Sequence, residues 1–152
     1  MSIVCEFQDL QPAPAVTIRL RTPAAELPSA LGRCFRETFQ HITSQGRQPA
    51  GPPFVAYFNM DMQDLEIEVG YPVAEALEAA GEIRPSSLPG GRAAVCLYTG
   101  PYQEMMPAYE ALQALVDEHG AQANGITYEH YLNDPAETPP AQLQTRIVFP
   151  LA

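Results

Sequence analysis

An internal repeat limits the fold of this 152-residue chain more than any other feature of its sequence. Residues of the first half recur 78 positions later, as Pro23 and Pro101, Glu26-Leu27 and Glu104-Met105, Leu31 and Tyr109, and Tyr71-Pro72 and Phe149-Pro150. Between them, Gly46 and Tyr57-Phe58-Asn59 recur at an offset of 74, as Gly120 and Tyr131-Leu132-Asn133. The longer loop DPAETPPAQ in the second half absorbs the return to 78. This ordered series predicts a tandem duplication.

Each repeat has the hydrophobic pattern of a strand, a helix and two further strands. In the first repeat, residues 15–73, we expect a strand at 15–21, a helix from about 27 to Gly46, and a hairpin of 53–59 with 65–73. In the second repeat, residues 92–150, the same elements fall at 93–99, 105–120, 126–133 and 143–149. Residues 74–91 form the connector, a crossover with room for one helical turn.

These elements predict an α+β fold in which the two strand-helix-strand-strand units share a single domain over residues 1–152. Each unit is too short to close its own sheet, so two units should pack about a pseudo-two-fold axis and pool their apolar faces. We expect antiparallel sheets with the helices on one side. Such a pseudo-symmetric pair leaves a central ligand groove along its axis.

Composition excludes several classes of function. Hydrophobic residues make up 46% of the chain and charged residues 17%, which is typical of a folded protein. The net charge of -10, without any basic cluster, argues against nucleic-acid binding. No export signal or membrane-spanning stretch is present, so we expect a cytoplasmic protein. The three cysteines and three histidines lack metal-ligand or disulfide-framework spacing, and we expect no metal and no cofactor.

Six segments of the chain together form a recognisable pattern. They are LPGGRAAVCLYTGPY, AYEALQ, YEHYLNDP and RIVFPL in the second half, with GPPFVAYFN and LEIEVGYPV in the first. In this order they resemble the GyrI-like domain, the effector-binding domain of multidrug-responsive transcription regulators. The resemblance covers nearly the whole chain, and from the length of 152 residues we expect a stand-alone member of that family. It implies a groove for lipophilic compounds that are often cationic or planar and aromatic, with a strand glutamate as its acid. The matching residue here is Glu129.

Strand alternation supplies companions for this glutamate, because it places Glu129 and Tyr131 on one face of their strand. Through the repeat, Tyr57 is the counterpart of Tyr131, and we expect these two tyrosines to wall the groove. Tyr71 and Phe149 end the paired hairpin strands and are candidates to cap it. Tyr102 and Tyr109 belong to family segments in which we expect helix packing rather than ligand contact, and Glu66 with Glu68 is read as a solvated strand face.

Three functions fit these features. The first is binding or sequestration of a lipophilic cation, since an acid in an apolar cleft selects positive charge and aromatic walls favour flat cationic ligands. The second is hydrolysis of strained cyclopropane-type alkylating natural products, with Glu129 as general base and Tyr131 as hydrogen-bond donor. The third is a gyrase-protecting interaction with a protein partner. We favour a binding protein over an enzyme, because catalysis requires a positioned donor in addition.

Overall fold

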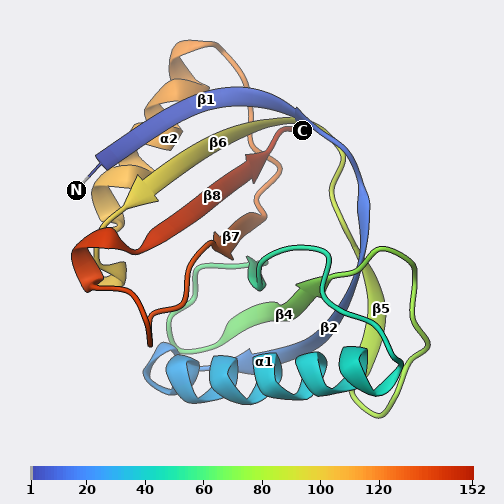
Figure 1. The fold of residues 1–152 in the computed structure, drawn as a ribbon. Helices are drawn as coiled ribbons and strands as arrows, with labels where there is room; N and C mark the ends of the chain where they lie inside the picture. The colour runs from blue at the N-terminus through green and yellow to red at the C-terminus, as the bar shows by residue number, and fades with distance from the viewer. Residues whose placement is uncertain (1) are drawn as a thin grey trace. The chain divides into compact units, whose positions relative to one another are not determined.

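The computed structural model describes residues 2–152 and divides into two compact units (Figure 1). Unit 1 comprises the residues up to Gln11 together with Gly90–Ala152, and unit 2 comprises Pro12–Pro89. Over the described residues the chain forms eight strands and two α-helices, and each unit holds four strands and one α-helix. All strand pairs within the units are antiparallel, which confirms the α+β class.

In unit 2 the strand order is β3-β4-β2-β5. Its strands are β2 (Ala13–Thr22), β3 (Phe54–Tyr57), β4 (Leu65–Pro72) and β5 (Ile83–Leu88), with the 3-10 turn η1 (Ala24–Glu26) and helix α1 (Leu27–Ser44) between β2 and β3. Helix α1 packs against β2 and β4 (Figure 1). It buries Cys34, Thr38 and Ile42, which the 3.6-residue period places on one face. The chain leaves the helix through Gly46, whose φ of 71° favours glycine.

In unit 1 the strand order is β1-β6-β8-β7. Its elements are β1 (Ser2–Leu10), β6 (Gly91–Thr99), η2 (Tyr102–Glu104), α2 (Met106–Glu118), β7 (Thr127–Tyr131), η3 (Pro140–Gln142) and β8 (Gln144–Pro150). Helix α2 packs against β6 and β1 through Ala108, Leu112 and Val116. These side chains meet a fully buried row from the sheet that includes Cys96 and Ile147.

Two strands, β1 and β5, were not predicted from the sequence, and the helical turn expected within residues 74–91 is wrong because β5 lies there. Each of these strands stands first or last in the strand order, and neither sequence alternates regularly between apolar and polar residues. In β1, Val4 is 57% exposed on the face opposite the core. In β5, Pro85 cannot donate a backbone hydrogen bond, a property that restricts proline to edge strands.

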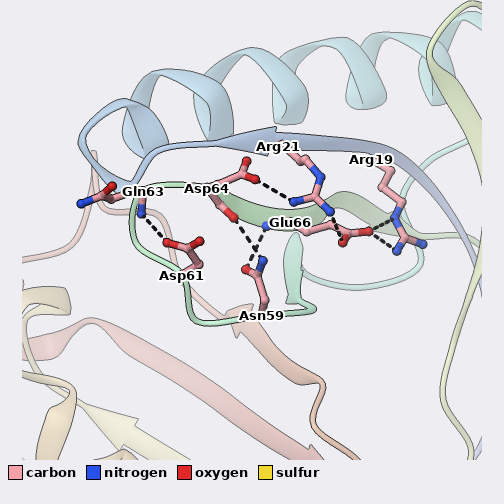
Figure 2. Close-up of polar contacts among 7 residues, drawn as sticks. All are labelled: Arg19, Arg21, Asn59, Asp61, Gln63, Asp64 and Glu66. Carbon is pink, nitrogen blue, oxygen red and sulfur yellow. Dashed lines mark hydrogen bonds and ion pairs between the residues drawn. The ribbon is translucent and has the colours of Figure 1, made fainter.

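An asparagine side chain makes the same pair of hydrogen bonds to the backbone in each of the two hairpins. In unit 2 the Asn59 side chain donates to the carbonyl of Asp64 and accepts from the backbone N–H of Glu66 (Figure 2). In unit 1 the Asn133 side chain makes the same two bonds, to the carbonyl of Gln142 and from the N–H of Gln144. These bonds hold the register of β3 with β4 and of β7 with β8. The partners differ by 74 and 78 positions, the offsets of the sequence repeat, while the duplication itself stays a prediction.

Candidate functional site

The hairpin of β7 and β8 sets the position of Glu129. At its start, Asn124 accepts a hydrogen bond from the backbone N–H of Ile126, and Gly125 adopts a φ of 95°. The resulting register pairs Glu129 with Ile147, a residue of the core beneath α2. Because side chains directly opposite in a sheet share a face, Glu129 points to the side that α2 covers. The carboxylate therefore lies on the apolar side of the sheet.

Glu129 is only 7% exposed, and two tyrosine hydroxyls donate to its carboxylate. Tyr131 donates to Oε1 at 2.7 Å, and Tyr109, from helix α2, donates to Oε2. The shared face predicted for Glu129 and Tyr131 is confirmed by this bond. Burial raises the pKa of Glu129, and the two tyrosine hydrogen bonds oppose that rise in part. The carboxylate is therefore less stable as an anion here than in water.

Aromatic rings surround this acid. Tyr102, from η2, packs edge-on against Tyr131 with ring centroids 5.6 Å apart, and Tyr109 lies 5.9 Å from Phe149. We call Glu129, Tyr102, Tyr109, Tyr131 and Phe149 the Glu129 cluster. All five residues belong to unit 1, and they come from η2, α2, β7 and β8. The cluster combines one buried acid with four π-faces.

Thr145 adds an unsatisfied polar group to the same face. The β8 register pairs it with Tyr131 on one side and with Tyr98 of β6 on the other. Its side chain is fully buried, and its Oγ1 has no hydrogen-bond partner among the described residues. Tyr98 is not available to it as a donor, because its hydroxyl already donates to the carbonyl of Pro101 at 2.7 Å. A buried hydroxyl without a partner costs about 1–3 kcal/mol.

The sequence-predicted site residues fall in both units. Glu129, Tyr131 and Phe149 come together in the Glu129 cluster of unit 1. Tyr57 and Tyr71 lie in unit 2, on β3 and β4. The ring of Tyr71 packs against two aromatic rings of α1, at 5.9 Å from Phe35 and 5.8 Å from Phe39. The ligand role of all five predicted residues stays a prediction.

Sequence reasoning missed Tyr109, which was assigned to helix packing. The repeat holds a signal for it once the helices are aligned by their buried residues. The rings of Phe35 and Tyr71 are 5.9 Å apart, as are those of Tyr109 and Phe149, so Phe35 is the counterpart of Tyr109 at an offset of 74. The earlier pairing of Tyr109 with Leu31 is therefore corrected.

The two helices differ in length, since α1 has 18 residues and α2 has 13. The offset between matching residues of the two repeats therefore changes from 78 to 74 within the helix. At the same offset of 74, Val55 is the counterpart of Glu129. Where unit 2 has phenylalanine and valine, unit 1 thus has tyrosine and glutamate. The two residues that form a hydrogen bond in unit 1 therefore correspond to two apolar residues in unit 2.

The strand carboxylates Glu66 and Glu68 form no paired acid site. Glu66 binds Arg19 and Arg21, and Arg21 also binds Asp64 at 2.9 Å (Figure 2). The bond from Arg19 lowers the pKa of Glu66. Glu68 accepts hydrogen bonds from Thr17 and Ser86. The ion pairs of Glu66 and Asp64 with the two arginines lie at the surface, where such pairs contribute little to stability.

Two structural features are absent from residues 2–152. No group of three or more His, Cys, Asp or Glu side chains is placed to hold a metal ion. Neither α-helix combines the length and hydropathy that a membrane crossing needs.

A family model, the GyrI-like small molecule binding domain, matches residues 4–152. The chain belongs to the GyrI-like family. This match also assigns it a small-molecule-binding domain. No curated protein matched the sequence.

Solved structures of low sequence identity share the GyrI-like fold. The crystal structure of the EcmrR C-terminal domain is 16% identical, with a TM-score of 0.76 over 100% of this chain and 99% of that one. The EcmrR–DNA complex gives 18% identity and a TM-score of 0.81 over 98% of this chain, which spans only 57% of the EcmrR chain.

Two further structures bear on ligands and activity in other proteins. SAV2435 bound to tetraphenylphosphonium is 11% identical, with a TM-score of 0.70 over 98% of this chain and 94% of that one. A protein described as a hydrolase from Listeria innocua is 10% identical, with a TM-score of 0.73 over 97% of this chain and 91% of that one. At these identities the likeness shows the fold alone.

Proposed function

We propose that this domain binds a lipophilic cation, often planar and aromatic, through the Glu129 cluster. The observation that carries the proposal is a carboxylate only 7% exposed that has two neutral donors and no cationic partner. Within residues 2–152, no lysine or arginine forms an ion pair with Glu129. A buried anion without a counter-charge is costly, and an incoming cation removes that cost.

The surrounding rings favour the same class of ligand. Tyr102, Tyr109, Tyr131 and Phe149 offer apolar faces whose quadrupoles attract positive charge, at about 0.5–2 kcal/mol for each good contact. A hydrated inorganic cation gains little from such faces, whereas a quaternary or delocalised organic cation gains from both ring and acid. Tyr57 and Tyr71, which the sequence also predicts as ligand contacts, lie in unit 2.

Two isosteric ions test this proposal. Tetraphenylphosphonium, the ligand of SAV2435, and tetraphenylborate have nearly the same shape and opposite charge, so titration calorimetry with both separates charge recognition from apolar contact. We expect wild-type protein to bind the cation more tightly than the anion. Glu129→Gln should weaken the cation about 10- to 100-fold, the equivalent of about 1–3 kcal/mol, and should not weaken the anion.

The matched control is Glu118→Gln, which removes the same charge from an exposed position at the end of α2. It should leave both affinities unchanged. Equal losses for the cation and the anion in Glu129→Gln, or an equal loss in Glu118→Gln, would remove Glu129 from the recognition role.

Hydrolysis of a strained electrophile is the second candidate, favoured by one observation. Burial raises the pKa of Glu129, which moves the carboxylate towards the range of an effective general base at neutral pH. Tyr109 and Tyr131 would then supply hydrogen bonds to the leaving group. The test is turnover of a cyclopropane-bearing alkylating agent: multiple turnovers that Glu129→Gln slows about 100- to 10,000-fold support an enzyme, and stoichiometric capture supports a binding protein.

A further inference from the structure

Cys5 and Cys96 lie side by side in unit 1. The antiparallel register of β1 with β6 places Cys5 directly opposite Cys96. Cys96 is fully buried in the core beneath α2, and Cys5 packs against the same core while remaining partly exposed. Both side chains therefore point to the same face. The third cysteine, Cys34, is buried on α1 in unit 2.

The spacing of antiparallel strands suits a bond between these thiols. Residues directly opposite have Cα atoms about 4.5 or 5.5 Å apart, depending on their place in the hydrogen-bond ladder. Both separations lie within the range of about 4.4–6.8 Å that disulfides span. In unit 1, β1 pairs with β6 alone, so it can adjust its position without breaking a second ladder.

We propose that Cys5 and Cys96 form a redox modification site, at which a peroxide or a small-molecule disulfide converts the dithiol to a reversible cross-strand disulfide. With hydrogen peroxide, the Cys5 thiolate attacks one oxygen, the O–O bond breaks, and the second oxygen leaves as water. Cys5 becomes a sulfenic acid. The Cys96 sulfur then attacks the Cys5 sulfur, and its proton leaves with the displaced oxygen as a second water. Two electrons pass from the thiols to the peroxide.

The environments of the two thiols set their order of reaction. Cys5 is the one that solvent reaches, so it meets the oxidant first. Burial, together with the contact to Cys5, raises the pKa of Cys96 to about 12, so Cys96 stays a thiol and does not react with the oxidant itself. It reacts only after a sulfenic acid has formed on Cys5, directly opposite. Cys96 is thus the resolving residue. The disulfide would fasten the N-terminal strand to the centre of unit 1.

The test treats the reduced protein with one equivalent of hydrogen peroxide or of diamide and measures intact mass. We expect a loss of about 2 Da, disappearance of two of the three thiols in a denaturing thiol titration, and a Cys5–Cys96 peptide on mapping. Dithiothreitol should restore the original mass. The oxidised form should also melt at a higher temperature, because the bond closes a long loop of chain.

Variants separate this site from nonspecific oxidation. Cys34→Ala should still lose about 2 Da, while Cys5→Ser, at the partly exposed position, should not. Cys96→Ala should leave Cys5 as a mixed adduct or a sulfenic acid. A wild-type protein that gains oxygen without losing 2 Da, a disulfide-linked dimer, or a bond to Cys34 would overturn the proposal.

Discussion

Replacing Tyr109 by phenylalanine removes the hydroxyl of one of the two tyrosines that donate to the Glu129 carboxylate and keeps the aromatic ring. The counterpart position in unit 2 already carries Phe35, at the same 5.9 Å from its partner ring, so the phenylalanine ring should fit. A hydrogen bond to a charged group contributes about 1.5–3 kcal/mol, and one between neutral groups about 0.5–1.5 kcal/mol. Above the pKa of Glu129, where the carboxylate is charged, we expect Tyr109→Phe to lower the free energy of unfolding by about 1.5–3 kcal/mol. Below that pKa we expect a loss of about 0.5–1.5 kcal/mol.

The pH dependence identifies the cause. Burial raises the pKa of Glu129 in the folded state above its unfolded value, so the fold loses stability as pH rises through the window between these two values. Tyr109→Phe removes a contact that opposes the rise, so it raises the pKa of Glu129 in the folded state further. The stability that this variant loses should therefore grow as pH increases above the wild-type pKa of Glu129. Urea denaturation from pH 4 to pH 8 measures this difference.

Tyr102→Phe is the matched control for this experiment. It removes a hydroxyl from a ring of the same cluster that packs on Tyr131 and donates no hydrogen bond to Glu129. Its effect on stability should be smaller and should not vary with pH. A deficit of Tyr109→Phe that is constant over pH, or equal to that of Tyr102→Phe, would refute the assignment of the Tyr109 hydroxyl to Glu129.

Two further predictions concern buried polar groups in unit 1. Thr145→Val removes, at nearly constant volume, a buried hydroxyl that has no hydrogen-bond partner within residues 2–152. It should raise the free energy of unfolding by about 1 kcal/mol in urea melts, and a loss would reveal a hydrogen-bond partner for Oγ1. Burial, with a smaller effect of Arg146, lowers the pKa of His130 to about 4. The fold should therefore lose about 3 kcal/mol as pH falls from about 6.5 to 4, and His130→Gln should flatten this part of the stability profile unless another group causes it.

The elements that form the core could be predicted from the sequence because their apolar residues recur with the period of a helix or a strand. The stripe of Cys34, Thr38 and Ile42 and the alternation of β4 identify elements that bury one face. Strands β1 and β5 were not predicted because none of their residues is fully buried. Strand β5 also contains Pro85, and a proline is evidence against a strand in the sequence pattern. Chain-end and edge elements owe their structure to a neighbour rather than to their own pattern.

The site was predictable in part for a similar reason. Alternation within one strand relates Glu129 to Tyr131, and that contact is confirmed. The bond from Tyr109 joins a helix to a strand 20 positions away, and no local period encodes such a contact. The facing of Cys5 and Cys96 depends on the pairing of β1 with β6, which cannot be read without first recognising β1.

The affinity for tetraphenylphosphonium, measured as a function of pH, tests most directly whether the Glu129 carboxylate recognises a lipophilic cation. If the ionised Glu129 carboxylate recognises the cation, affinity should fall as pH is lowered through the raised pKa of Glu129, because protonation removes the charge. This fall should begin at a higher pH than exposed glutamates titrate. Glu129→Gln should bind weakly with no pH dependence over the same range. A wild-type affinity that is flat with pH, or a Glu129→Gln profile that matches the wild type, would show that the Glu129 carboxylate does not recognise the cation.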